Sequence, residues 1–286
     1  MQIAAAAYPV EALPDWDALH RKLTTWVAEA DAELAVFPEY AGLDAALIGA
    51  TTPLSAAEET ARAIEAAPRY WQMLAEIAQA QRTTLLGGSL PARNATGALV
   101  NRAALITRTG EIAFIDKRQL TPWEQAETPL SPGRDLPVFD PPGLPRLGVL
   151  ICYDGEFPLQ ARAIRQAGAG LLLMPSATEG PAGATRVRLA ARTRALESGG
   201  HVVLAQTVGD CAVSAYLDRS RGRAGIYAAP DGHAPSDGIL AETAADRPGW
   251  ARATLKPRPK GDVDITAAWD TQHILAQLTP FAQKHA

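Results

Sequence analysis

The sequence has little excess charge of either sign and no long apolar run. Its 27 lysine and arginine residues are balanced by 31 aspartate and glutamate residues, which gives a formal net charge of -4. A chain without a dense Lys/Arg cluster has no bulk attraction for nucleic-acid phosphates or anionic lipid. No apolar run approaches membrane-spanning length, and the N-terminus lacks a basic flank followed by an apolar core. We therefore expect a cytoplasmic protein that binds neither nucleic acid nor a membrane.

Cysteine and histidine are also scarce. The only two cysteines are Cys152 and Cys211, and in the absence of a signal peptide both are expected to be free thiols. The histidines show neither metal-site spacing nor a nearby cysteine or carboxylate that would complete a triad: His20, His201, His233, His273 and His285. No phosphate-binding glycine loop occurs, since Gly87-Gly88-Ser89 is too short. The sequence thus predicts no metal, no cofactor and no histidine-dependent cysteine protease.

What the sequence does contain is an alternation of short apolar runs with helix-like segments, which indicates an α/β fold. Runs typical of buried strands occur at 2–8, 33–37, 83–89, 147–152, 171–175 and 201–205. Segments with helical spacing lie between these runs, at 15–32, 55–67, 70–81, 159–167 and 185–198. Pro68 separates the second predicted helix from the third. Two strand-like runs, at 102–108 and 111–116, are joined by Thr109-Gly110 and predict a hairpin. The hairpin makes the predicted sheet mixed, and apolar runs at 224–229 and 250–255 add further strands.

The length and the even composition favour one domain. A chain of 286 residues with 47% hydrophobic positions can bury a large core, and no linker-like shift in composition appears. We predict a single domain over 1–286, with the core at about 1–255 and a weakly packed tail at about 256–286. The Pro/Gly-rich passage at 121–145 is expected to be a surface loop that approaches the site.

Cys152 is placed where its thiol can act as a nucleophile. It follows the apolar run 147–151, and open α/β sheets build their ligand sites at the C-terminal ends of such strands. A thiol attacks well only as a thiolate, which requires a nearby base or cation. Glu39 ends another strand, where burial would raise its pKa towards neutrality and suit it to proton transfer. Lys117 follows the hairpin and could stabilise the thiolate and then an oxyanion, beside the backbone N–H of Tyr153.

Each of these residues also has an ordinary structural interpretation. A buried cysteine is more often a small hydrophobic residue than a nucleophile, and Cys211 keeps that interpretation. Glu39 could be a charge at a helix N-terminus, and Lys117 could be a solvated lysine. Glu124 could start a helix after Pro122, or it could orient the lysine. The combination of these residues therefore carries more weight than any one of them.

Three stretches together resemble the Glu, Lys and Cys motifs of the nitrilase superfamily of carbon-nitrogen hydrolases, in the same order. They are Phe37-Pro38-Glu39-Tyr40, Asp116-Lys117-Arg118-Gln119-Leu120-Thr121-Pro122-Trp123-Glu124 and Leu150-Ile151-Cys152-Tyr153-Asp154-Gly155-Glu156-Phe157-Pro158. Further similarity lies in Gly87-Gly88-Ser89, in 194–197 and in 225–232. The resemblance implies a four-layer α-β-β-α sandwich, catalysis without a cofactor or metal, and a homodimer or larger homo-oligomer. It also implies that Glu39 is the general base, Lys117 the oxyanion lysine, Cys152 the nucleophile and Glu124 the second glutamate.

The resemblance further favours an amide as the substrate. Cys152-Tyr153-Asp154 is similar to the amidase-like branches, including those that act on ω-amides, whereas nitrilases usually have Trp-Glu after the cysteine and carbamoylases Cys-Asn-Asp. Two positions depart from the amidase-like pattern, because Glu156 stands where many members have Arg and Ser198 where Asn is frequent. A substrate carboxylate would then need another partner, such as Arg118.

The expected activity is that of a small-molecule amidase that works through a thioester on Cys152 and releases ammonia or an amine. Hydrolysis of a nitrile or an N-carbamoyl compound by the same Glu-Lys-Cys site is the alternative, and a catalytically silent binding or regulatory member is a lesser one. Trp123 and Tyr153 are expected to form walls of the substrate pocket. The segment after the next strand could present backbone or hydroxyl groups to the amide through Ser176, Ala177 and Thr178.

Overall fold

The computed structural model describes residues 1–230 and 233–255, so the predicted tail at 256–286 lies outside the described residues. The strands are β1 (Gln2–Tyr8), β2 (Leu34–Phe37), β3 (Thr84–Arg93), β4 (Leu99–Ile106), β5 (Ile112–Asp116), β6 (Val138–Phe139), β7 (Leu147–Val149), β8 (Leu171–Ser176), β9 (His201–Thr207), β10 (Gly225–Ala228), β11 (Ile239–Glu242) and β12 (Gly249–Thr254). The helices are α1 (Trp16–Ala30), α2 (Leu43–Ala46), α3 (Ala56–Gln81), α4 (Pro122–Glu127), α5 (Pro158–Gln166) and α6 (Pro181–Ser198), and a 3-10 helix, η1, spans Cys152–Glu156.

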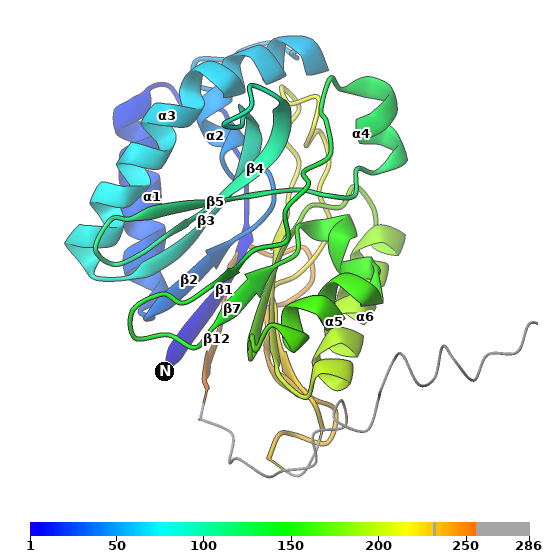
Figure 1. Ribbon diagram of the computed structural model, residues 1–286. Helices are drawn as coiled ribbons and strands as arrows, with labels where there is room; N and C mark the ends of the chain where they lie inside the picture. Colours follow the sequence, from blue (N-terminus) through cyan, green and yellow to red (C-terminus); the bar gives the residue numbers. More distant parts are fainter. Residues whose placement is uncertain (231–232, 256–286) are drawn as a thin grey trace, which may run out of the picture.

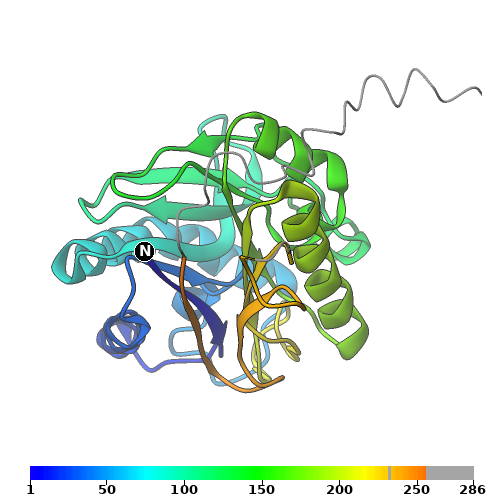
Figure 2. The same ribbon diagram turned by 90° about the horizontal axis from the view of Figure 1, so that it is seen from below.

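The strands form two mixed halves of one hydrogen-bonded sheet, joined at a single place. One half has the order β12-β1-β2-β3-β4-β5 and the other the order β11-β10-β9-β8-β7-β6. The halves meet where Ala7 and Tyr8 of β1 pair with Gln206 and Thr207 of β9. Away from this junction β1 pairs with β12 instead, so the halves diverge and face each other (Figures 1 and 2).

Strand β1 shows how the layers are packed. Its residues alternate between two cores, as the period of two in a strand requires. Ile3, Ala5 and Ala7 belong to the core that contains β7, β8 and β9, whereas Ala4 and Ala6 belong to the core beneath α1 and α3. Helices α5 and α6 cover the other half of the sheet (Figure 1). The result is the α-β-β-α sandwich that the family resemblance implied.

Most predicted elements are present, including the hairpin of β4 and β5, but the prediction of two helices separated by Pro68 was wrong. A single helix, α3, runs through Pro68 over 26 residues. An internal proline removes one backbone hydrogen bond and typically costs about 3 kcal/mol. The helix continues because residues on both sides of Pro68 are buried against the sheet, among them Ala63, Ala67 and Leu74. Tertiary packing here outweighs the local effect of proline.

Three predicted boundaries also shift near the site. The passage expected to be a loop contains α4 and β6, and α6 begins at Pro181, four residues before the predicted start. The apolar run before Cys152 leaves the sheet at Val149, so that Cys152 begins a 3-10 helix. Among residues 1–230 and 233–255, no helix combines the length and apolarity required to cross a membrane.

Candidate active site

The predicted catalytic residues come together where several strands end. Glu39 follows β2, Lys117 follows β5 and Cys152 follows β7. Parallel strands place their C-terminal ends on one edge of the sheet, and β2 and β7 lie in the two halves that meet at the β1–β9 junction. All three residues, together with Glu124, line one cavity of about 510 Å³. These strand ends converge, as the sequence predicted.

Glu39 is buried and fully engaged by hydrogen bonds. Its Oε1 accepts from Lys117 Nζ at 2.7 Å and from Asn101 Nδ2 at 2.9 Å, and its Oε2 accepts from the backbone N–H of Ala177 at 3.0 Å. Burial, opposed by the charge of Lys117 and reinforced by that of Glu124, raises the pKa of Glu39 to about 7. A carboxyl group with a pKa near neutrality both accepts and returns a proton readily at physiological pH.

Lys117 is held between two carboxylates and has almost no exposed surface. Its Nζ donates to Glu39 Oε1 at 2.7 Å and to Glu124 at 2.8 Å (Oε1) and 2.7 Å (Oε2). Burial disfavours the charged amine, but Glu39 and Glu124 outweigh it and raise the pKa of Lys117 above its usual value. Lys117 is therefore a permanent cation, and charge-assisted hydrogen bonds fix its position.

Glu124 owes its position to the start of α4. The Oγ1 of Thr121 accepts from the backbone N–H of Glu124 at 3.2 Å, and Glu124 Oε2 accepts from the N–H of Thr121 at 2.7 Å. This capping box satisfies N–H groups at the helix start, while Pro122 occupies the first helical position. The hydroxyl of Tyr40 donates to Glu124 Oε1 at 2.5 Å. Against the effect of burial, Lys117 lowers the pKa of Glu124, which stays ionised.

Cys152 presents its thiol from a strained backbone. Its φ of 49° lies in the left-handed region that residues other than glycine rarely adopt. The Sγ donates to the carbonyl of Ala177 at 3.4 Å, and a hydrogen bond with Cys152 is among the interactions that lower the pKa of Glu39. Burial, together with the charge of Glu39, raises the pKa of the Cys152 thiol well above its ordinary value, although Lys117 opposes the shift. At rest the thiol is protonated, and attack requires a base.

The raised pKa of Glu39 predicts the acid side of the pH profile. We expect kcat/KM for an amide to fall about tenfold for each pH unit below about 7, because protonated Glu39 cannot accept the thiol proton. The apparent pKa belongs to the cluster of Glu39, Lys117 and Glu124, since their titrations are linked. Initial rates of ammonia release between about pH 5 and pH 9 measure this acid limb of the pH profile, in which kcat/KM falls with decreasing pH. A limb centred near the pKa of an ordinary glutamate, about 4.3, would contradict the assignment.

Three residues of the site were not predicted from the sequence. Asn101 in β4 is fully buried, and its Nδ2 donates to Glu39 at 2.9 Å and lies 3.4 Å from Glu124 Oε1. Tyr40 belongs to the Glu motif, but no role was predicted for its hydroxyl, which donates to Glu124. The only available signal for Asn101 was an amide within a largely apolar strand, where Arg102 is the other polar residue. Asp154 is the third such residue.

Asp154 ties the turn that carries Cys152 to the segment after Lys117. Its Oδ1 accepts from the backbone N–H groups of Gln119 at 2.6 Å and Arg118 at 3.1 Å, and its Oδ2 accepts from that of Ile151 at 3.2 Å. Burial raises the pKa of Asp154 to about 6, although these N–H groups oppose the shift. The aspartate of the Cys-Tyr-Asp motif thus sets the relative position of nucleophile and lysine.

Asp154→Asn is expected to lower both stability and turnover. The new amide directs a donor at one of the N–H groups, and an unsatisfied buried group destabilises by about 1–3 kcal/mol. A shift of Cys152 relative to Lys117 should lower kcat by about 10- to 100-fold, because a misplacement of about 1 Å has effects of that size. Urea unfolding and kcat measure the two effects. Asp246→Asn, which removes a carboxylate that accepts from the Gly222 N–H, is the matched control and should leave kcat unchanged.

The structure separates the other predicted site residues into two groups. Tyr153, Trp123 and Thr178 line the cavity, and Trp123 packs edge-on against Tyr216 with ring centroids 5.2 Å apart. Ala177 contributes through its backbone, whose N–H and carbonyl contact Glu39 and Cys152. Ser176 does not reach the cavity, because its buried Oγ donates to the carbonyl of Met174 at 3.3 Å. The predicted segment therefore lines the cavity through Ala177 and Thr178 rather than through Ser176.

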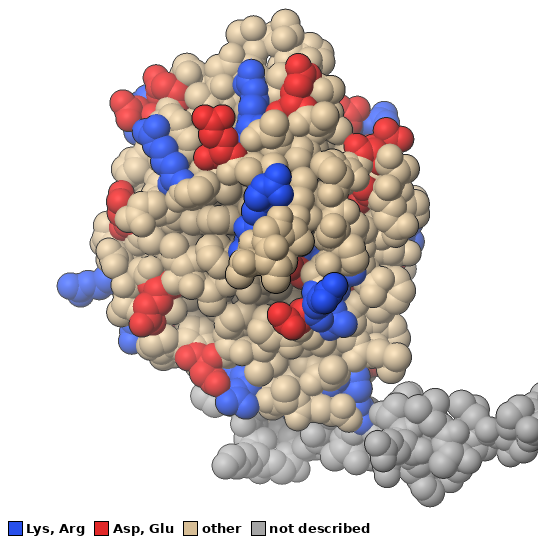
Figure 3. Space-filling model, turned by 45° about the horizontal axis from the view of Figure 1, so that its top comes forward, with Lys and Arg blue, Asp and Glu red and all other residues tan. Residues whose placement is uncertain are grey.

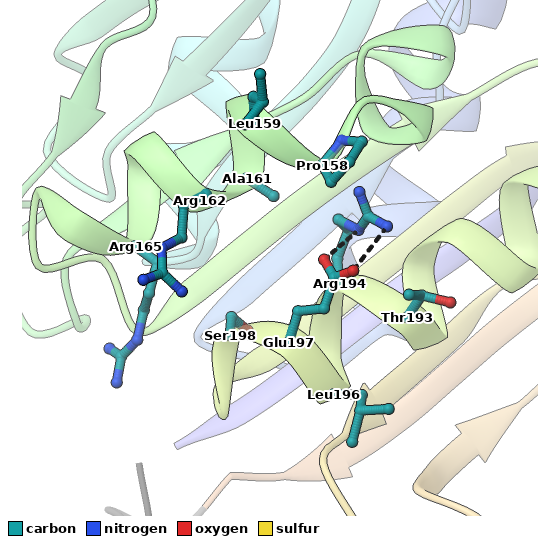
Figure 4. Close-up of a pocket in the computed structure, with 10 residues that line it drawn as sticks. All are labelled: Pro158, Leu159, Ala161, Arg162, Arg165, Thr193, Arg194, Leu196, Glu197 and Ser198. Carbon is teal, nitrogen blue, oxygen red and sulfur yellow. Dashed lines mark hydrogen bonds and ion pairs between the residues drawn. The ribbon is translucent and has the colours of Figure 1, made fainter. Parts of the chain in front are cut away.

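A second cavity, of about 470 Å³, lies between α5 and α6 (Figure 4). Its lining includes Arg194, Leu196 and Glu197 of the motif 194–197. Within this motif, Arg194 Nε and Glu197 Oε2 are 3.1 Å apart. Ser198 also lines this cavity, and its Oγ accepts from the N–H of Gly200 at 3.1 Å. Neither Cys152 nor Lys117 lines it. These motif residues are therefore outside the candidate site.

The state of the two cysteines was also predicted from the sequence. Both Cys152 and Cys211 are free thiols, as expected, and Cys211 does not line the cavity of Cys152. Within the part of the chain that the structure describes, no group of three His, Cys, Asp or Glu side chains is arranged to hold a metal ion.

Comparison with known proteins extends the similarity beyond the motifs. Residues 2–233 match the model of the carbon-nitrogen hydrolase family. The chain is 31% identical over 222 residues to the probable hydrolase YhcX of Bacillus subtilis, covering 76% of this chain and 41% of that protein. It is 32% identical over 148 residues to the omega-amidase NIT2 of Bos taurus, covering 49% and 52% of the two chains. The chain thus spans about half the length of these sequence relatives.

The fold is similar to that of a solved amidase. The NitN amidase from Nesterenkonia sp. AN1 superposes with a TM-score of 0.72 and 25% sequence identity, over 97% of this chain and all of that one. The family match covers most of the chain and agrees with the Glu, Lys and Cys motifs read from the sequence. The chain belongs to the carbon-nitrogen hydrolase family.

Proposed function

We propose that the protein is an amidase that cleaves the C–N bond of a small, non-peptide amide through a thioester on Cys152. One observation carries the proposal: a thiol, a carboxyl group with a pKa near neutrality and a buried ammonium group line the same cavity, as Cys152, Glu39 and Lys117. These are the nucleophile, the proton carrier and the electrostatic stabiliser that acyl transfer requires.

In the first half of the reaction the Glu39 carboxylate accepts the proton of the Cys152 thiol, and the sulfur forms a bond to the amide carbon. The carbonyl electron pair moves to oxygen, where the charge of Lys117 and the N–H of Tyr153 stabilise the oxyanion. Glu39 then returns the proton to the amide nitrogen as the C–N bond breaks. Ammonia or an amine leaves, and the acyl group remains on Cys152 as a thioester.

In the second half water replaces the amine. Glu39, ionised again, accepts a proton from water while the oxygen attacks the thioester carbon, and the same donors stabilise the second oxyanion. The C–S bond breaks, the proton passes from Glu39 to the thiolate, and the carboxylic acid leaves. Glu124 takes no proton in this sequence, because its lowered pKa keeps it ionised beside Lys117. It acts by holding the lysine in place.

Two similarities support an amide as the substrate. The sequence relative from Bos taurus is an omega-amidase and the structural relative is an amidase. Cys152-Tyr153-Asp154 also resembles the amidase-like branches more than the nitrilases or carbamoylases. Nitrile hydrolysis would use the same three residues and would appear as turnover of nitriles without turnover of the corresponding amides.

A panel of short amides, nitriles and N-carbamoyl compounds, read out by ammonia release, tests the proposal. We expect turnover of amides and, after rapid acid quench, a mass increase on the peptide that contains Cys152, equal to the acyl group. If only the nitriles are hydrolysed, the protein is a nitrilase rather than an amidase. No turnover, with no reaction of Cys152 with iodoacetamide at neutral pH, would support a catalytically silent protein instead.

A further inference from the structure

Charged side chains gather around the cavity in pairs of opposite sign. Two guanidinium groups line it, those of Arg186 and Arg219, and each is paired with a carboxylate that also lines it. The carboxylate of Asp218 lines the cavity as well, in addition to those of Glu39 and Glu124. On the face shown in Figure 3, acidic and basic side chains are likewise interspersed, without a wide basic region. Negative groups therefore outnumber positive ones at the cavity.

The Arg186–Glu156 pair is next to the nucleophile. Glu156 ends the 3-10 helix that Cys152 begins, and Arg186 extends from the second turn of α6. The Arg186 Nε lies 3.1 Å from Glu156 Oε2, and its Nη2 donates to Oε1 at 3.3 Å. The pKa of Arg186 is raised mainly by Glu156 and to a lesser extent by Cys152 and Tyr153, which places the guanidinium within the electrostatic reach of the thiol.

The Arg219–Glu179 pair is the second ion pair that lines the cavity. Arg219 Nη2 is 2.6 Å from Glu179 Oε1, and both side chains are more than half exposed. Asp218 adjoins Arg219 in the chain, so Glu179, Asp218 and Arg219 together bring more negative than positive groups to the cavity. Deeper in the cavity, two carboxylates, Glu39 and Glu124, surround the single ammonium of Lys117. Arg118, the expected alternative partner for a substrate carboxylate, does not line the cavity.

We infer that the cavity accepts amides whose acyl group is neutral or cationic, and that Glu156 is a specificity residue that disfavours monoamides of dicarboxylic acids. The inference rests on the proposed amidase function and narrows its substrate class. A substrate carboxylate that binds Arg186 must displace Glu156, which then remains nearby as an unpaired like charge. Building repulsion against a competing ligand is a general means of specificity.

The size of the effect follows from the exposure of the pair. Arg186 is 62% exposed and Glu156 20% exposed, so solvent screens their interaction. Exposed pairs of this kind contribute little by themselves, and repulsion between the substrate carboxylate and Glu156 is the larger contribution. We expect discrimination of about 10-fold in kcat/KM, decreasing with added salt, because screening shortens the range of charge interactions. The rings of Trp123 and Tyr216, which line the cavity, offer apolar surface to a neutral acyl group.

Three amides of similar length but different charge test the inference: succinamate, pentanamide and 4-aminobutanamide. For the unchanged protein at low salt, kcat/KM should be lowest for succinamate, by about 10-fold relative to pentanamide. Glu156→Gln frees Arg186 and should raise the ratio of succinamate to pentanamide by about 10-fold. It should lower the ratio of 4-aminobutanamide to pentanamide. Glu179→Gln should act in the same direction.

Asp140→Asn is the matched control. It removes one carboxylate from an exposed ion pair, with Arg146 at 2.7 Å, that does not line the cavity. Its substrate ratios should equal those of the unchanged protein. The inference is overturned if the unchanged protein prefers succinamate, if Glu156→Gln scales all three rates equally, or if Asp140→Asn has the same effect as Glu156→Gln. Absence of turnover on every amide, with no thioester on Cys152, would instead overturn the proposed function itself.

Discussion

Cys152→Ala is expected to abolish amide hydrolysis while leaving the fold intact. Without the sulfur no thioester forms, and loss of a catalytic nucleophile typically lowers kcat by on the order of 10⁴- to 10⁶-fold. The side chain is only 4% exposed, but alanine removes a single heavy atom. The φ of 49° is equally unfavourable for both residues, so stability should change by less than about 1.5 kcal/mol. Ammonia release and thermal unfolding measure the two effects.

Cys211→Ala provides the matched control for Cys152→Ala. Cys211 is also a buried free thiol, at 7% exposure, but it does not line the cavity of Cys152. Its replacement should have a similar small effect on the unfolding temperature and no effect on kcat. Substantial activity in Cys152→Ala, or loss of activity only in Cys211→Ala, would show that the nucleophile is assigned wrongly.

The sequence predicts the convergence of the central residues because strand ends carry a strong local signal. Glu39 and Cys152 follow short apolar runs, and Lys117 follows a hairpin marked by Thr109-Gly110. In a sheet with parallel strands these ends share one edge. Burial of Glu39 was expected from its apolar neighbours, and the pKa of about 7 agrees with that expectation. The local sequence pattern and the sheet topology together were therefore sufficient to predict that Glu39, Lys117 and Cys152 converge.

Other features depend on contacts that no local pattern reveals. Asn101 lies inside β4, and only the fold shows that its amide donates to Glu39 across 62 positions of the chain. Ser176 and Ala177 are adjacent, yet the hydroxyl of Ser176 bonds back to Met174 whereas the backbone of Ala177 meets Glu39. Pro68 is retained within α3 because the helix is buried on both sides of it. In each case tertiary packing decides between alternatives that the sequence leaves open.

The pairing of Glu156 was equally hidden from the sequence. The position was recognised as a departure from the amidase-like pattern, but its partner, Arg186, lies 30 residues away on α6. The predicted start of that helix, at Thr185, also left Pro181 and the first turn outside it. Glu156 stands where many amidase-like members have a cation, and it also pairs with Arg186. We therefore infer that this position affects which acyl groups the cavity accepts.

Lys117→Met should impair both stability and catalysis, because it removes the cation between two buried carboxylates. Lys117 is 1% exposed, and its Nζ supplies three hydrogen bonds to Glu39 and Glu124. Breaking a buried ion pair by removing one partner typically destabilises by about 3–5 kcal/mol. Loss of an oxyanion donor lowers kcat by about 100- to 1000-fold. The absence of the cation also raises the pKa of Glu39, so less of the base is ionised at neutral pH.

The stability deficit of Lys117→Met should depend on pH in a defined direction. In the variant the two carboxyl groups have folded-state pKa values above their unfolded values, so the folded state binds more protons. Stability is then retained at low pH and lost as pH rises through the folded-state pKa values. Urea unfolding at about pH 5 and about pH 8 should therefore show a smaller deficit at the lower pH. An equal deficit at both values would mean that the carboxylates do not depend on Lys117.

Lys22→Met separates the catalytic role of Lys117 from its structural one. Lys22 is also largely buried and pairs with two carboxylates, Glu11 and Asp44, each at 2.9 Å, but none of these residues lines the cavity. Its loss should destabilise the fold while kcat per folded molecule remains unchanged. Lys117→Met should lose kcat even after correction for the folded fraction, because the oxyanion keeps the N–H of Tyr153 but lacks the charge beside it. If the corrected kcat values of the two variants are equal, Lys117 serves only to neutralise Glu39 and Glu124.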